Sequence, residues 1–411
     1  MKIKKDTIMA YALKNALEHE GNAIAGAVVN SLFNEGLKKS EIKEIMPEVL
    51  DILNKINRWG RDIQEREFEK LEDFVSKRKV REGMQELEGV GRKGIVTRFA
   101  PSASGPFHVG HALTASLSFL YVQKYGGKFY VRIEDTNPEN SFKDSYKLIE
   151  KDSDWLFKGE AKIVIQSERI KLYYKYAEKL IKKRKAYVCE CSVDRFKDFV
   201  NARKNCPCRE LNIKKQMEKW KNMLDKKGYK EGDAVLRFKS DMKHKNPAMR
   251  DFPLARISES VHPMQGRKCR VWPLMNLAVA VDDIEMKMTH LIRGKDHRDN
   301  ALRQQMIYKV LGKKSPKNYF LGRINFKDME LSTSQMRRDI KAGKYKGWDD
   351  ERLPTLAALR KKGYKPSAFW RFTEQIGFSE VDKTMDKKEF FLLLDNFNME
   401  KTTASSRQGA I

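Results

Sequence analysis

The N-terminal part of the chain has the hydrophobic pattern of helices. Apolar residues recur about every three to four positions in IMAYALKNALEHEGNAIAGAVVNSLF, residues 8–33. The same spacing continues with dense charge in SEIKEIMPEVLDILNKINRWGRDIQEREFEKLEDFVSKRK, residues 40–79. These stretches predict a small helical bundle with polar outer faces over residues 1–90, without evident chemistry of its own.

The pattern changes after the glycine-containing break at residues 89–94. GIVTRFAPS (94–102) predicts a strand and a turn, GHALTASLSFLYVQKYGG (110–127) predicts an amphipathic helix closed by glycines, and KFYVRIEDTNP (128–138) predicts a second strand that ends in acidic and turn residues. Strand, helix and strand in this order are typical of a βαβ unit in a parallel sheet, so the fold class is α/β. Such sheets bind ligands beyond the carboxyl ends of their strands.

The segment FAPSASGPFHVGH, residues 99–111, connects the first predicted strand to the predicted helix. A helix that begins there presents unpaired N–H groups and a positive dipole end, which favour a phosphate. His108 and His111 can add hydrogen-bond donors or positive charge on the same face, and Gly110 leaves room for a flat ring against the backbone. Neither a Walker loop nor a GxGxxG fingerprint occurs in the proper context, and two helix histidines alone are more often structural.

Composition narrows the choice of ligand. The 411 residues contain 83 lysines and arginines against 56 acidic residues, a formal net charge of +27. This excess favours a polyanion such as RNA, with a merely solvated basic surface as the alternative. We expect a cytoplasmic protein that does not enter a membrane, because no apolar run reaches the roughly 18 residues of a spanning helix and no signal-peptide pattern begins the chain. Its cysteines are then expected to be thiols or metal ligands.

Four longer stretches of the sequence indicate which class of RNA-binding or nucleotide-binding protein this is. TRFAPSASGPFHVGHALTA (97–115), GGKFYVRIEDTNPEN (126–140), VWPLMNLAVAVDDIEMKMTHLIRGKDH (271–297) and LSTSQMRRDIKAGKYKGWDDERLPTLAALRKKGY (331–364) resemble, in this order, the glutamyl and glutaminyl branch of class I aminoacyl-tRNA synthetases. With its helical N-terminus and LSTS loop, nearly the whole chain is similar to the archaeal type of glutamyl-tRNA synthetase.

This resemblance implies a Rossmann-type parallel-sheet catalytic core with additions. The implied organisation is a helical N-terminal domain at 1–90, the two halves of the catalytic core at 91–185 and 271–330, an acceptor-end-binding insertion with a zinc knuckle at 186–270, and the signature loop with a helical stem-contact region at 331–411. The implied reaction joins glutamate to AMP from ATP, with Mg²⁺ accompanying ATP, and then passes the glutamyl group to the 3′ end of tRNA.

The family's nucleotide-binding motifs can be carried over residue by residue. They imply catalytic roles for His108, Gly110, His111, Ser332 and Ser334, and ATP binding by these five together with Ala100, Ser102, Gly105, Leu331 and Thr333. In the family, the H-x-G-H element stabilises the charge that develops as the amino-acid carboxylate attacks the α-phosphate.

The family's amino-acid site can be matched in the same way. Glutamate offers two carboxylates and one ammonium, so its site needs a guanidinium and a carboxylate. The resemblance implies that Arg98 meets the side-chain carboxylate and that Glu134 holds the α-amino group. Arg293 stands where the glutamine enzymes have a small uncharged residue, and a buried arginine without an opposing carboxylate selects against the neutral amide. Asn276 follows Met275, which occupies a pocket position, and is included among the glutamate-binding residues.

The second signature departs from the family's K-M-S-K-S form. ELSTS, residues 330–334, fills the five positions without either signature lysine, whose charge normally neutralises the triphosphate. Archaeal relatives carry a lysine directly after LSTS, whereas this chain has Gln335. Arg337, Arg338 or Lys327 are the candidates to supply the missing cation.

Two C-x-C pairs lie in the predicted insertion. Cys189 with Cys191 and Cys206 with Cys208 suit a tetrahedral zinc ion, with reduced unliganded thiols as the alternative. In the family a C-x-C and a C-x-H pair often form a zinc knuckle here, and Cys208 in place of the histidine preserves the number of ligands. The lysines that follow are expected to contact the phosphates of the tRNA acceptor stem, and Cys269 is expected to be an inert thiol.

The chain ends in the polar tail TTASSRQGAI (402–411), where the family continues into anticodon-reading β-barrels. We expect tRNA(Glu) as the partner, tRNA(Gln) as a further candidate, and a separate anticodon-binding polypeptide as one explanation of the short chain. Relaxed tRNA choice is a second explanation, and an activity like that of glutamyl-queuosine tRNA(Asp) synthetases is a third. A non-catalytic tRNA-binding module with a degenerate active site is the non-enzymatic alternative.

Overall fold

The computed structural model describes residues 3–75 and 83–399. The chain divides into two compact units, Met1–Val80 and Arg81–Ile411, and each is described here by itself. The first unit contains helices α1 (Lys5–Glu18), α2 (Ala25–Leu32), α3 (Ile42–Ile56) and α4 (Arg61–Leu71). In α3 the apolar stripe Val49, Ile52, Leu53 and Ile56 is buried, as its helical spacing requires.

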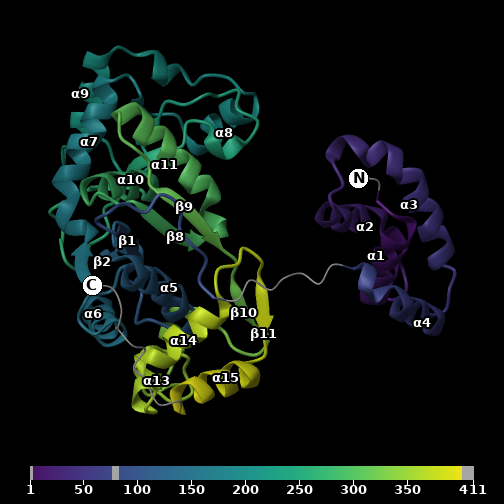
Figure 1. Cartoon of the computed structure of the whole chain (residues 1–411). Coiled ribbons are helices and arrows are strands. Elements are labelled where there is room, and N and C mark those ends of the chain that lie inside the picture. Colours follow the sequence, from purple (N-terminus) through teal and green to yellow (C-terminus); the bar gives the residue numbers. More distant parts are fainter. Residues whose placement is uncertain (1–2, 76–82, 400–411) are drawn as a thin grey trace. The chain divides into compact units, whose positions relative to one another are not determined.

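The second unit is built around parallel strands. These are β1 (Ile95–Phe99), β2 (Gly127–Ile133), β3 (Lys162–Ile165), β8 (His290–Gly294) and β9 (Lys317–Leu321). Strand β2 pairs in parallel with β1 and β3, and β8 pairs in parallel with β9. The N–H of Thr289 donates to the Val96 carbonyl at 2.9 Å, so the order across the core is β3-β2-β1-β8-β9 (Figure 1). This order is that of a Rossmann-type core, and the predicted α/β class is confirmed.

Helix α5 (Val109–Tyr125) connects β1 to β2 and completes the predicted βαβ unit. Strand β2 ends at Ile133. The N–H of Glu134 still donates to the Pro101 carbonyl at 2.8 Å, and Glu134 bridges Ser102 in the register of β1 and β2, but the strand pattern stops after this bridge. Residues 134–140 therefore form a loop at the carboxyl end of the sheet, next to the segment that leads into α5.

An antiparallel sheet is inserted between the two halves of this core. It contains β4 (Ala186–Cys189), β5 (Val235–Phe238), β6 (Pro253–Ile257) and β7 (Val271–Pro273), in that order. Helices α7 (Ile170–Lys182), α8 (Val193–Asn201) and α9 (Ile213–Leu224) accompany it, and α10 (Met275–Glu285) and α11 (Arg298–Leu311) lead back into the core (Figure 1). Trp220 and Trp272 are fully buried within this part.

The insertion is tied to the loop that follows β2. The Arg256 guanidinium donates to Asn137 Oδ1 at 3.0 Å, and His262 Nε2 lies 2.8 Å from the Asp135 carbonyl oxygen. Asp135 directly follows Glu134, which is one of the predicted glutamate-binding residues. The insertion is therefore in contact with the edge of the predicted amino-acid site.

The remaining elements cover the core and carry the signature loop. They are α6 (Lys143–Phe157), β10 (Ile324–Phe326), α12 (Thr333–Lys341), α13 (Leu356–Lys361), α14 (Pro366–Ile376), β11 (Lys383–Met385) and α15 (Lys387–Met399). Helix α14 lies beside α5 (Figure 1), and its Phe369 and Phe372 belong to the same buried cluster as Phe119 and Phe390. Within the described ranges, no helix combines the length and the apolar character that crossing a membrane requires.

Candidate active site

The H-x-G-H element begins helix α5 at the carboxyl end of β1. His108 is the N-cap residue, and its Nδ1 accepts the N–H of His111 at 3.3 Å. The two imidazoles stack with their centroids 3.7 Å apart. Burial, with a further contribution from His111, lowers the pKa of His108 well below its usual range, and burial lowers the pKa of His111 to about 4. Both rings are therefore neutral at pH 7, so the positive charge considered above is absent and the rings are available as hydrogen-bonding groups.

The two nucleotide motifs pack directly on each other. A Cβ added at Gly110 would lie 3.1 Å from Leu331 Cδ1 and 3.2 Å from His108 Cε1. A Cβ added at Gly105 would collide with the Thr333 methyl group. A side chain at Gly105 would force the loop to move, whereas at Gly110 the neighbouring side chains would have to shift by a few tenths of an ångström, because the signature loop lies against the segment that precedes α5 and against its first turn.

The signature loop leads into helix α12. The Ser332 hydroxyl caps this helix by accepting the N–H of Gln335 at 3.2 Å. The Gln335 amide donates to Asp339 Oδ1 at 3.0 Å and accepts from Arg338 at 2.5 Å. These contacts run along α12, so Gln335 is paired with both Asp339 and Arg338.

Arg337 holds the loop to the core. Its guanidinium donates to the Ser104 carbonyl at 3.0 Å, to both Asp144 oxygens at 3.1 Å and to the Ser145 hydroxyl at 3.0 Å. The same group lies 3.9 Å from the centroid of the Phe142 ring. Because its donors are engaged in this way, Arg337 anchors the loop and is not the free cation that the sequence comparison considered. Lys327 is exposed.

Two adjoining cavities lie at the carboxyl ends of the strands. The first, about 340 Å³, is lined by Arg98, Ala100, Ser102, His111, Glu134 and Arg293 among the sequence-predicted residues. The second, about 550 Å³, is lined by His108, Gly110, His111 and Leu331. His111 lines both, so the predicted amino-acid and nucleotide residues meet there. Ser332 instead opens onto a third cavity of about 270 Å³, and Ser334 and Asn276 line none of the three.

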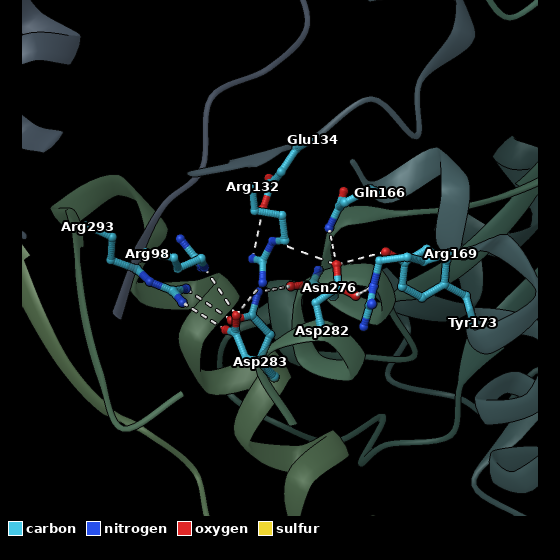
Figure 2. Close-up of polar contacts among 11 residues, drawn as sticks. Arg98, Arg132, Glu134, Gln166, Arg169, Tyr173, Asn276, Asp282, Asp283 and Arg293 are labelled. Carbon is cyan, nitrogen blue, oxygen red and sulfur yellow. Dashed lines mark hydrogen bonds and ion pairs between the residues drawn. The ribbon is translucent and has the colours of Figure 1, made fainter. Parts of the chain in front are cut away.

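A network of arginines and carboxylates forms the floor of the first cavity (Figure 2). Asp283 Oδ1 accepts from Arg98 Nε at 3.1 Å and from Arg132 Nη1 at 2.6 Å. Arg132 is fully buried and also donates to Glu134 Oε1 at 3.0 Å. Burial alone would raise the pKa of Asp283, but the charges of Arg98, Arg132 and Arg293 outweigh it and hold the pKa below its usual value. Asp283 is therefore ionised and links the arginines.

Asp282 connects this floor to α7 and the turn before it. Its carboxylate accepts from Arg169 at 2.7 Å, from the Gln166 amide at 2.8 Å and from the Tyr173 hydroxyl at 2.7 Å (Figure 2). Sequence reasoning did not single out Arg132, Asp282 or Asp283. The signals available were an arginine inside an otherwise apolar strand and a DD pair at the end of an apolar helix, since such buried charges must be paired.

Arg293, at the end of β8, has unused hydrogen-bonding capacity. Its side chain is 7% exposed, and Nη1 donates to Gln304 Oε1 at 3.0 Å. Nη2 lies 4.0 Å from Asp283 Oδ2, and neither Nε nor Nη2 has a hydrogen-bond partner among the described residues. Burial, followed by the charge of Arg98, lowers the pKa of Arg293 to about 10, so the group remains charged at pH 7. Asn276 lies behind it and accepts from the Gln304 amide at 3.5 Å.

The four cysteines predicted as metal ligands lie together. Cys189 is the last residue of strand β4 and Cys191 follows it, and their sulfur atoms gather with those of Cys206 and Cys208 within 4.8 Å of one another. The closest pairs are 3.4 to 3.9 Å apart, near the spacing of about 3.8 Å that thiolates at about 2.3 Å from a tetrahedral zinc ion would have. All four are free thiols, and the arrangement fits zinc.

Asp152 on α6 supports the start of the H-x-G-H element, a role that sequence reasoning missed. Its Oδ2 accepts the N–H of Phe107 at 2.9 Å, and Arg360 lies 3.5 Å from Oδ1. The residue is 1% exposed. Burial raises its pKa to about 7, although the bond from Phe107 and the charge of Arg360 act in the opposite direction.

We therefore expect the Asp152→Asn variant to become more stable, relative to the wild type, as the pH rises. The raised pKa means that the folded protein holds a proton that the unfolded chain loses near pH 4, so the wild type loses stability as the pH rises from about 4 to 7. Asparagine still accepts from Phe107 but carries no charge, so its stability relative to the wild type should increase by about 3 kcal/mol between pH 5 and pH 8. Urea unfolding of both proteins at the two pH values measures this difference, and a constant difference would contradict the assignment.

Comparison with known proteins agrees with this geometry. Residues 94–401 match the family described as tRNA synthetases class I (E and Q), catalytic domain. The chain belongs to this family of class I aminoacyl-tRNA synthetases.

The relatives to which the chain is similar are named glutamate–tRNA ligases. The glutamate–tRNA ligase of Methanocaldococcus jannaschii is 42% identical over 379 residues, covering 92% of this chain and 68% of that protein. The glutamate–tRNA ligase of Thermococcus kodakarensis is 39% identical over 390 residues, covering 93% and 68%. A glutamate–tRNA synthetase structure from Elizabethkingia anophelis, 22% identical, has a TM-score of 0.51 and covers 73% of this chain and 69% of that one, which supports the fold alone.

Proposed function

We propose that this chain activates glutamate with ATP and transfers it to tRNA. A carboxylate oxygen of glutamate attacks the α-phosphorus of ATP, pyrophosphate leaves, and the glutamyl group of glutamyl-AMP then passes to the 3′-terminal adenosine of tRNA. The relatives named above favour this reaction over a glutamyl-queuosine activity or a non-catalytic role. In this family ATP is a substrate and Mg²⁺ accompanies it.

The observation that carries the proposal is the charge balance of the first cavity. The groups in Figure 2 comprise four guanidiniums, Arg98, Arg132, Arg169 and Arg293, and three carboxylates, Glu134, Asp282 and Asp283. One positive charge is therefore left over. Among the described residues Arg293 has two nitrogen atoms without a hydrogen-bond partner, Nε and Nη2, whereas Arg132 has one, Nε. Glutamate carries a net charge of −1 at pH 7 and glutamine carries none, so glutamate completes the balance.

The two cavities also suit the two substrates of the activation step, glutamate and ATP. Arg293 and Arg98 would receive the side-chain carboxylate, and Glu134 would receive the ammonium group. The nucleotide would occupy the second cavity, where the first turn of α5 offers N–H groups and His108 and His111 offer neutral imidazoles. Since His111 lines both cavities, the reacting carboxylate and the α-phosphate would meet beside it.

The loop 331–334 would cover the nucleotide, with Leu331 at the second cavity and Thr333 against Gly105. Ser332 caps α12, so its contribution and that of Ser334 would come through the position of the loop. Asn276 would act on glutamate through Gln304 and Arg293 rather than by direct contact.

The insertion would bind the acceptor end of tRNA, with tRNA(Glu) as the partner and tRNA(Gln) as a further candidate. Zinc held by the four cysteines would stabilise the segment between β4 and α9, which contains α8. The ties from Arg256 and His262 to residues 135–137 would keep this part in contact with the amino-acid cavity.

The exchange of label between pyrophosphate and ATP tests the function directly. We expect exchange that requires glutamate and tRNA and that glutamine does not support. Reactions without an amino acid and without tRNA are the controls. If no condition supports exchange by the pure, folded chain, the proposed activation step is wrong for this polypeptide alone.

Gln335→Lys should increase the exchange rate. A lysine at this position restores a cation directly after the LSTS loop, and a charge that meets the phosphates in the transition state contributes about tenfold or more. We expect kcat to rise with KM for glutamate unchanged. Gln335→Met is the matched control because it lacks the charge and breaks the same contacts with Asp339 and Arg338. Equal rates in both variants would show that a cation here does not limit the reaction.

A further inference from the structure

We infer that Gln304 determines the amino-acid specificity of this site by orienting Arg293 without neutralising it. The inference rests on the proposed function and extends it to a residue of α11. Gln304 is 3% exposed and lines the first cavity together with Arg98, Glu134 and Arg293. It is a positioning residue, because it acts on the substrate through the guanidinium that it holds.

The orientation of the Gln304 amide follows from its two neighbours. Arg293 has only donors, so the amide must present its oxygen to Nη1, and the two atoms are 3.0 Å apart. The amide nitrogen then faces Asn276 Oδ1 at 3.5 Å. With the amide turned over, two sets of N–H groups would face each other in a buried place. Arg293 thus selects the orientation of Gln304, and Asn276 accepts the amide N–H that this orientation presents.

This contact leaves the other side of Arg293 for a ligand. Gln304 occupies Nη1, whereas Nε and Nη2 have no partner among the described residues. Asp283 does not fill that place, since its Oδ2 is 4.0 Å from Nη2 and its Oδ1 already accepts from Arg98 and Arg132. A carboxylate entering the cavity can therefore satisfy the unpaired donors of Arg293.

The neutrality of Gln304 is the essential property. A carboxylate at this position would form an ion pair with Arg293 inside the protein, and the one uncompensated positive charge of the cavity would disappear. An amide supplies the same acceptor atom and the same geometry but leaves the charge to be balanced by the substrate. The site then favours the amino acid with a side-chain carboxylate over the amide of the same shape.

Gln304→Glu tests this inference because it changes charge with little change of shape. We expect it to raise KM for glutamate in tRNA-dependent exchange and to lower the glutamate-to-glutamine ratio of kcat/KM by about tenfold or more, with KM for ATP unchanged. Gln304→Met keeps the charge of Arg293 but removes its anchor. This variant should bind glutamate about tenfold more weakly and should keep a glutamate preference greater than that of Gln304→Glu. Glutamate and glutamine binding to wild type and both variants is measured by calorimetry as well.

The outcomes separate the two proposals. An unchanged glutamate-to-glutamine ratio in folded Gln304→Glu overturns the inference, and so does an equal loss for both amino acids accompanied by a higher KM for ATP. Wild-type affinity for glutamate in Gln304→Met overturns the positioning role. If the wild type binds glutamate but supports no exchange, the proposed function fails while the binding ratios still decide the role of Gln304. A wild type that binds neither amino acid overturns both.

Discussion

Replacing Arg293 by alanine is expected to raise KM for glutamate by about a hundredfold, with KM for ATP within about twofold of wild type. Arg293 is the cavity arginine with two unpartnered donors, and it accounts for the excess positive charge that a second carboxylate would balance. Removing it takes away both the charge-assisted hydrogen bonds and the preference for glutamate over glutamine. Steady-state pyrophosphate exchange with each substrate varied in turn measures the effect.

Arg298→Ala is the matched control for this experiment. Arg298 lies on the same stretch of chain, but its side chain is 52% exposed and pairs with Glu380 on the surface. Its removal should leave KM for glutamate unchanged, since exposed pairs contribute little. A KM for glutamate that stays at the wild-type value in Arg293→Ala would contradict the assigned binding mode.

Protein purified without a polyhistidine tag and under reducing conditions is expected to contain about one equivalent of zinc, and Cys206→Ser is expected to contain almost none. Cys206 is fully buried and its sulfur lies closest to those of Cys189 and Cys191. Loss of the ion removes the link that holds the turn after β4, and a metal site of this kind contributes directly to folding. We therefore expect lower thermal stability and a marked loss of tRNA aminoacylation.

Elemental analysis and thermal unfolding are the measurements for the metal site. Cys269→Ser is the control, because Cys269 is a free thiol outside the cluster and should leave zinc content and stability unchanged. Protein that contains no zinc, purified without chelator, would show that the four thiols are unliganded. Equal zinc content in Cys206→Ser and wild type would show that the metal lies elsewhere.

The sequence alone determined the class of fold and the identity of the two nucleotide motifs. Periodicity predicts local elements well where an apolar stripe or an apolar strand is long, as in α3 and β1, whereas α5, expected to be amphipathic, is buried at most of its residues. The position of His108 and His111 at the start of α5 follows from the order of strand and helix. Arg98, Glu134 and Arg293 are matched to a ligand with carboxylate and ammonium groups through the resemblance to the family, because their residue types alone are also those of ordinary ion pairs at strand ends.

Only the tertiary structure decided how those charges are shared. Asp283 and Arg132 are far apart in the chain, and their 2.6 Å contact forms only when the fold brings the residues of α10 and β2 together. Gln304 has no motif of its own and gains its place through one contact with Arg293 and one with Asn276. Similarly, the sequence alone leaves Arg337 as either a phosphate ligand or an anchor of the loop. Its bonds to Ser104 and Asp144 make it an anchor.

The physical reason is the range of the interactions involved. Hydrophobic spacing and helix capping act over a few neighbouring residues, so the sequence specifies them directly. The net charge of a cavity and the donors left without partners depend on side chains from several elements at once. These quantities appear only when the chain has folded, and they are what distinguishes a site for glutamate from a site for its neutral amide.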